Sequence, residues 1–94
     1  MNARHRRTLA ALFARPTATA VTWDALVGLL GALGATVAEK REGSRVAVAL
    51  RGAVFVLHRP HPRKEIDPAV VRELRQRLAA LGLTPDAITG EGNA

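Results

Sequence analysis

Apolar residues recur every three or four positions in three stretches of the chain, which is the spacing of one helix face. The first stretch runs from residue 5 to residue 14. The second begins after Thr22, a residue type that caps helices, and reaches Gly34, a favoured helix stop. The third begins with Asp67-Pro68, a cap followed by a first-turn proline, and ends at Gly82. The pattern predicts three helices.

Between the second and third helical stretches, apolar residues alternate with polar or small ones, which is the period of a strand. Three short strands are predicted, at residues 36–40, 45–50 and 53–59. On the second strand Val46, Val48 and Leu50 share one face, which we expect to pack on the helices while the other face meets a partner. The third strand is apolar on both faces, so we expect it to be central in the sheet or covered by a partner.

The order of these elements predicts an α+β fold, a three-stranded antiparallel sheet with two helices packed on one face, plus an extra N-terminal helix. Double-stranded-RNA-binding domains have this helix, sheet and helix arrangement, and they bind mainly through minor-groove and phosphate contacts. The 94 residues suffice for one small core. We expect an N-terminal helical extension at residues 1–20, the folded domain at residues 21–84, and a flexible tail at residues 85–94.

The composition of the chain narrows the classes of partner. There are 14 Lys and Arg residues against 8 Asp and Glu, a formal charge of +6, which favours a polyanion or an acidic protein. The aromatic residues are Phe13, Phe55 and Trp23, too few for a sheet that binds single strands by base stacking. The absence of cysteine excludes disulfides and agrees with a reducing cytoplasm. No apolar run is long enough to span a membrane, so no membrane partner is expected.

Half of the cations lie in the central segment, between residues 40 and 64, against the single acid Glu42. These cations are Lys40, Arg41, Arg45, Arg51, Arg59, Arg63 and Lys64. Strand ends, turns and loops are places from which long side chains reach phosphates. The stiff loop from Arg59 to Pro68 also holds His61 between two prolines and leads into a helix N-terminus, whose free amides attract anions. This segment is therefore expected to be a phosphate-facing site.

Two short motifs in this segment resemble the HicA toxin family. They are the run Lys40-Arg41-Glu42-Gly43-Ser44-Arg45 and, after a hairpin, Arg59-Pro60-His61-Pro62 before a capped helix, and the resemblance covers roughly Thr22 to Leu83. It implies a small RNA-cleaving toxin of a toxin-antitoxin pair, with a fold similar to a double-stranded-RNA-binding domain, held inactive by a HicB-like antitoxin. The family usually has Gly-Ser-His, with the histidine as the suspected catalytic residue. This chain has Arg45 at that position.

The replacement of the family histidine changes the candidate chemistry. An arginine cannot accept a proton at neutral pH, but it stabilises charge on a phosphate. Metal-independent RNA cleavage also needs a group that deprotonates the ribose 2′-hydroxyl, so the candidate catalytic residues are His61 and Arg45. His58 falls on the face of Val54 and Val56 and is expected to be a packed or edge histidine. The expected RNA-binding residues are Arg41, Ser44, Arg51, Arg59, Arg63 and Lys64. Without cysteine or a close pair of histidines the chain has no metal-ligand spacing, and we expect no cofactor.

Two other interpretations of the sequence stay open. In the first, the chain keeps the fold without catalysis and binds RNA or an acidic protein. In the second, the apolar hairpin is an interface for an antitoxin or for a second copy of the chain in a homodimer, and the charge is incidental.

The last helix carries three further arginines, at Arg72, Arg75 and Arg77. We interpret them as a solvated face rather than as part of a binding surface, with Glu73 and Arg77 as an ion pair one helical turn apart.

Overall fold

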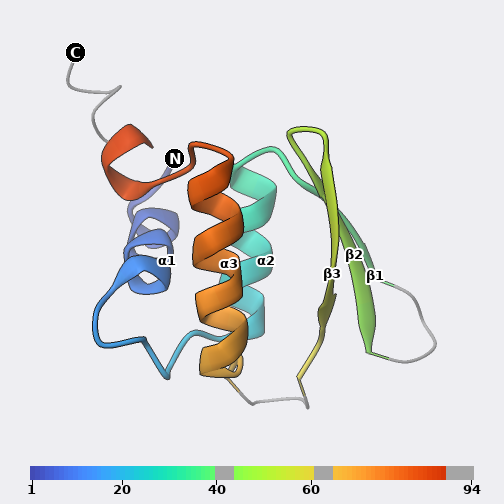
Figure 1. The fold of residues 1–94 in the computed structure, drawn as a ribbon, viewed down its shortest axis with the longest axis horizontal. Coiled ribbons are helices and arrows are strands. Elements are labelled where there is room, and N and C mark those ends of the chain that lie inside the picture. The colour runs from blue at the N-terminus through green and yellow to red at the C-terminus, as the bar shows by residue number, and fades with distance from the viewer. Residues whose placement is uncertain (40–43, 61–64, 89–94) are drawn as a thin grey trace.

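The computed structural model describes residues 1–39, 44–60 and 65–88. Its elements are, in chain order, α1 (Ala3–Phe13), α2 (Trp23–Ala32), β1 (Thr36–Glu39), β2 (Arg45–Leu50), β3 (Ala53–His58) and α3 (Pro68–Ala80) (Figure 1). The predicted α+β fold is confirmed, including the three antiparallel strands and the extra N-terminal helix.

The three strands form one sheet in the order β1-β2-β3. β3 was expected to be central in the sheet or covered by a partner. The central position is wrong, because three strands joined consecutively in antiparallel pairs place the middle one, β2, at the centre, and the second alternative stays a prediction. The turn between β2 and β3 is two residues long, and Arg51 and Gly52 both have positive φ, 49° and 80°, as a type I′ turn requires. This turn fixes the register, with Leu50 opposite Ala53 and Arg45 opposite His58.

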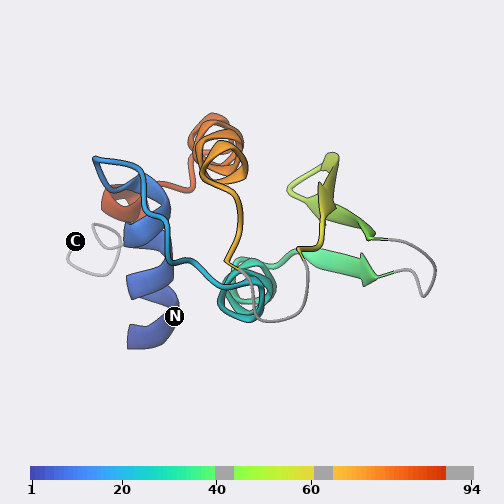
Figure 2. The ribbon, with the colours of Figure 1, turned by 90° about the horizontal axis from the view of Figure 1, so that it is seen from below.

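The molecule has three layers, which Figures 1 and 2 show from two directions. The pair α2 and α3 covers one face of the sheet, as expected, and α1 lies against the side of this pair that is turned away from the sheet. One core joins all three layers. Its members from α1, α2, the sheet and α3 include Leu9, Leu12, Leu26, Leu29, Leu30, Val46, Val48, Phe55, Leu57, Val71, Leu74 and Leu78. The N-terminal helix is therefore packed into the fold.

The ends of the helices follow from single residues. The Thr22 hydroxyl accepts a hydrogen bond from Ala25 N at 3.2 Å, and the Asp67 carboxylate accepts one from Ala69 N at 2.8 Å, so both predicted caps are confirmed. Gly34 and Gly82 follow α2 and α3 with φ of 96° and 76°, a backbone region that glycine adopts without strain. These local signals set the positions at which the helices meet the loops of the sheet.

Arg75 departs from the expectation of a solvated face on α3. Its Nε donates to the carbonyl of Leu12 at 3.0 Å and its Nη2 donates to the Thr17 hydroxyl at 3.2 Å, in a partly buried environment. Arg75 thus holds the end of α1 and the linker behind it. The predicted Glu73–Arg77 ion pair is confirmed at 3.1 Å.

The chain after α3 also packs on the fold. Residues 85–88 form one helical turn, in which the Thr84 hydroxyl accepts from Ala87 N at 3.1 Å. Ile88 is partly buried against the core. These four residues belong to the segment 85–94, which was expected to be a flexible tail.

Candidate functional site

Strand ends and helix starts meet at one end of the sheet, the lower end in Figure 1. Here β1 ends at Glu39, β2 begins at Arg45 and β3 ends at His58, and the first turns of α2 and α3 lie beside them. Ile66 N donates to Val21 O at 2.8 Å, next to a β-bridge between Thr22 and Glu65, so the segments leading into α2 and α3 run side by side. We call Glu39, Ser44, Arg45, His58 and Arg59 the strand-end site.

Arg45 and His58 form a cross-strand pair within this site. They are partners in the β2–β3 register, and both side chains are exposed. Their neighbours Val46 and Leu57 are buried against the helices, and successive side chains of a strand alternate between its two faces. Arg45 and His58 therefore project from the other face of the sheet, away from α2 and α3. Directly opposed residues have Cβ atoms about 5 Å apart, which brings the guanidinium and the imidazole within reach of one bound group.

Glu39 is the polar link between the strand-end site and α2. Its Oε1 accepts from Trp23 Nε1 at 3.3 Å, and its Oε2 lies 3.4 Å from Nη1 of Arg59. The carboxylate thus orients Arg59 from across the sheet. The Arg59 and Glu39 side chains are 40% and 41% exposed, and ion pairs of such exposure contribute about 0–1 kcal/mol, so this pair separates at low cost.

The structure gathers some of the predicted site residues and separates others. Ser44, Arg45 and Arg59 lie at the same end of the sheet, where the carbonyl of Ser44 accepts from Arg59 N at 2.7 Å, one residue beyond the last strand pair. The Arg59 side chain turns to Glu39 on the helix side of the sheet, whereas Arg45 projects from the other face. Arg51 lies at the opposite end of the sheet, where its Nη1 donates to Leu81 O at 3.2 Å. The remaining predicted residues lie outside the described part of the chain: Arg41, His61, Arg63 and Lys64.

His58 was expected to be a packed or edge histidine because it shares a face with Val54 and Val56. The structure places it on the exposed face of the edge strand β3, so the edge position is confirmed, whereas the pairing of His58 with Arg45 was missed. The pairing of His58 with Arg45 could have been predicted from the two-residue gap, Arg51–Gly52, between the second and third predicted strands. A two-residue hairpin turn pairs Leu50 with Ala53, and counting back along both strands pairs residue 45 with residue 58.

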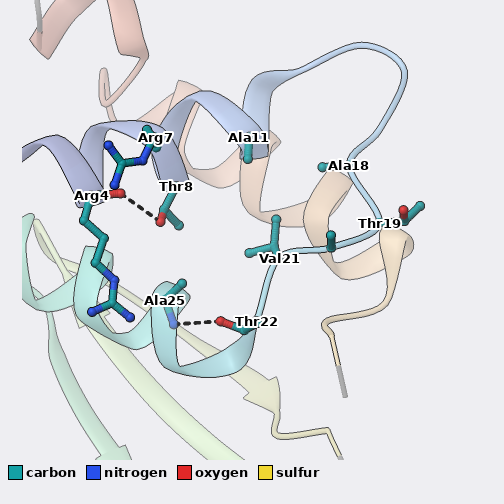
Figure 3. Close-up of a pocket in the computed structure, with 10 residues that line it drawn as sticks. Arg4, Arg7, Thr8, Ala11, Ala18, Thr19, Val21, Thr22 and Ala25 are labelled. Atoms are coloured by element: carbon teal, nitrogen blue, oxygen red, sulfur yellow. Dashed lines mark hydrogen bonds between the residues drawn. The ribbon is translucent and has the colours of Figure 1, made fainter. Parts of the chain in front are cut away.

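A pocket of about 300 Å³ lies elsewhere, between α1, the linker after it and the start of α2 (Figure 3). Its lining is mostly apolar, from residues such as Ala11, Val21 and Ala25, with Arg4 and Arg7 from α1 also contributing. It is lined by no carboxylate, imidazole or thiol. The pocket therefore holds no group for proton transfer, and the strand-end site is the better candidate for chemistry.

Residues 1–39, 44–60 and 65–88 contain no cluster of three or more His, Cys, Asp or Glu that could hold a metal ion. Within the same ranges, every helix is too short or too polar to cross a membrane.

Comparison with known proteins identifies the family. A family model described as the HicA toxin of bacterial toxin-antitoxin matches residues 23–90, more than two thirds of the chain. The matched segment includes the whole strand-end site and leaves α1 and the linker outside. Searches of curated proteins and of solved structures gave no match. The chain belongs to the HicA toxin family, as the motifs in its sequence predicted, and is thus the toxin member of a toxin-antitoxin pair.

Proposed function

We propose that this toxin binds RNA at the strand-end site and cleaves it there without a metal or other cofactor. The observation that carries the proposal is the cross-strand pair of Arg45 and His58, an exposed guanidinium beside an exposed imidazole inside the family-matched segment. Imidazole exchanges protons near neutral pH, and a guanidinium binds phosphate oxygens through two parallel hydrogen bonds. These are the two kinds of group that cleavage of an RNA strand requires.

The proposed reaction is attack by the ribose 2′-oxygen on the adjacent phosphorus. A base takes the 2′-hydroxyl proton, the 2′-oxygen bonds to phosphorus, and the bond from phosphorus to the 5′-oxygen breaks. The leaving 5′-oxygen takes a proton from an acid, which leaves a 2′,3′-cyclic phosphate and a 5′-hydroxyl. We assign the proton transfers to His58 and to His61, three positions later in the chain, and the stabilisation of phosphate charge to Arg45.

RNA binding in this proposal depends on cations at the same end of the sheet. Within the strand-end site, Glu39 holds the Arg59 guanidinium, and the backbone N–H of Arg59 donates to the Ser44 carbonyl. Arg41 is two residues after Glu39, while Arg63 and Lys64 directly precede Glu65, and both flanking acids lie at this end. We propose Arg41, Ser44, Arg59, Arg63 and Lys64 as the RNA contacts. Arg51 joins them only for an RNA that reaches the other end of β2, roughly 20 Å away.

The test uses purified toxin, free of antitoxin, and a labelled mixed-sequence RNA. We expect His58→Gln and His61→Gln each to lower the cleavage rate by about 10²- to 10⁴-fold while binding is kept. We expect the triple variant of Arg59, Arg63 and Lys64 to Ala to lose binding, and the binding of the unaltered toxin to weaken as salt is raised. Arg72→Ala, an exposed cation on α3, is the control and should change neither quantity. Full cleavage by both glutamine variants contradicts the assignment.

A second candidate function is RNA binding without cleavage. The observation that favours it is Arg45 itself, which cannot take a proton and stands where the family usually has its suspected catalytic histidine. In the same experiment this alternative gives salt-sensitive RNA binding that the triple variant abolishes, with no cleavage product from the unaltered toxin.

A further inference from the structure

The face of the sheet that is turned away from α2 and α3 has an unusual composition. It is formed by alternate residues of the three strands, which we call the outer sheet face: Thr36, Ala38, Ala47, Ala49, Val54 and Val56. Val54 is 72% and Val56 is 41% exposed, and they are two of the three large apolar side chains so exposed in the described part of the chain. No described element covers this face (Figure 2).

The arrangement of side chains on this face suits contact with another protein. The alanines of β1 and β2 have short side chains and make this part of the face flat. Val56 and Val54, which lie opposite Ala47 and Ala49, have larger side chains and form a low apolar ridge along β3. β3 is also an edge strand, and its six residues include no proline, lysine or arginine. Proteins ordinarily protect exposed edges with those residues, because a bare apolar edge pairs with other chains. An edge without such protection indicates a partner that covers it.

The charges on the outer sheet face indicate which class of molecule covers it. Arg45 and His58 are the ionisable side chains on this face of the described strands, and no carboxylate accompanies them there. A second copy of the chain would bring the same apolar floor with more cations and no acid to pair with them. RNA would find methyl groups in place of hydrogen-bond donors. A protein surface that is apolar in its centre and bordered by Asp or Glu complements both features.

We infer that the outer sheet face is the surface on which the antitoxin docks, and that the antitoxin presents an apolar patch with an acidic border. The partner follows from membership of a toxin-antitoxin family, and the regulatory consequence rests on the proposed function. Val54 is four residues along β3 from His58, about 13 Å, and a standard interface covers about 800 Å² on each protein. An antitoxin seated on the face therefore also covers Arg45 and His58 and blocks access of RNA to them.

The test measures the affinity of the toxin for its own antitoxin, by calorimetry with the two purified proteins. We expect Val54→Asp to weaken binding at least 100-fold, because it puts a carboxylate among apolar groups and near acidic ones. Val54→Lys should weaken it less, since a lysine reaches the acidic border. Ala10→Asp adds the same charge on the exposed side of α1, in the far layer, and should leave the affinity unchanged. Circular dichroism checks that each variant folds, and Val56→Asp replaces any that does not.

Each outcome decides the inference. The inference is overturned if the affinity of Val54→Asp for the antitoxin is within threefold of that of the unaltered toxin. It is also overturned if the toxin alone is a dimer and Val54→Asp converts that dimer to monomers. RNA cleavage is measured separately on antitoxin-free Val54→Asp, which should cleave normally. If the unaltered toxin cleaves nothing while Val54→Asp still loses the antitoxin, the proposed function fails and the docking surface stands. If cleavage occurs and antitoxin binding survives, only the docking surface fails.

Discussion

Two glycines in α2 differ in what surrounds them, and each has a distinct effect on stability. A Cβ on Gly31 would meet no atom within 4 Å, whereas a Cβ on Gly28 would lie 3.0 Å from Cε1 of His5. We expect Gly31→Ala to raise the free energy of unfolding by about 0.5–1 kcal/mol, because alanine favours the helix. Gly28→Ala gains the same propensity but must displace the imidazole, so its net effect should be smaller or destabilising. Urea unfolding of the two variants measures the difference.

The His5→Ala background supplies the control for this pair. With the imidazole gone, Gly28→Ala should stabilise the protein as much as Gly31→Ala does, and the double-mutant cycle isolates the contact. His5 Nδ1 is buried and has no hydrogen-bond partner among the described residues, so its removal costs no hydrogen bond there. A Gly28→Ala variant that is fully stabilised in the presence of His5 would show that the contact carries no energy.

Single residues also show which features of the structure can be predicted from the sequence alone. Thr22, Asp67, Gly34 and Gly82 were predicted correctly as caps and stops because each acts on backbone groups within a few positions of itself. The contact of His5 with Gly28 joins helices that are far apart in sequence, and no local pattern announces it. Within the candidate site, local pattern predicted both ends of β2 and placed the end of β3 one residue late, at Arg59 instead of His58. The Glu39–Arg59 pair, in contrast, depends on two edge strands meeting across β2.

At the scale of elements, Arg75 on α3 fastens α1 and the linker to the helix pair. We expect Arg75→Met, which keeps an apolar stem, to lower the free energy of unfolding by about 1–3 kcal/mol, because the Leu12 carbonyl and the Thr17 hydroxyl lose their donor in a partly buried place. Hydrogen exchange should quicken most in α1. Arg72→Met is the matched control on the exposed face of α3 and should stay within about 0.5 kcal/mol. Equal losses from both variants would argue against a specific fastening.

The strands show the same limit of prediction at this scale. The alternation on β2 correctly separated buried Val46, Val48 and Leu50 from the other face. β3 has apolar residues on both faces, and periodicity cannot tell a strand buried on both sides from an edge strand whose second face awaits a partner. The wrong expectation of a central β3 and the proposed docking surface thus have one origin, an apolar face that no described element of the chain buries.

At the scale of the whole molecule, α1 lies outside the family match yet contributes to the single core. Leu9 and Leu12 are 1% and 0% exposed, in the same cluster as the buried residues of α2, α3 and the sheet. The N-terminal helix is therefore expected to unfold together with the rest of the molecule. Trp23, the only tryptophan, lies at the start of α2 and bonds to Glu39 on β1, so its fluorescence reports on the contact between α2 and the sheet.

Leu12→Ala tests this shared stability. Its cavity should lower the free energy of unfolding by about 2–5 kcal/mol. Because the core is continuous, Trp23 fluorescence and far-ultraviolet circular dichroism should shift to lower urea together and stay superimposed. If α1 were an appendage, circular dichroism would show an early loss of helix while the fluorescence transition kept its original midpoint. Coincident transitions instead mean that α1 stabilises the family-matched segment through the shared core. Removal of the first 20 residues should then destabilise the strand-end site, although none of its residues is lost.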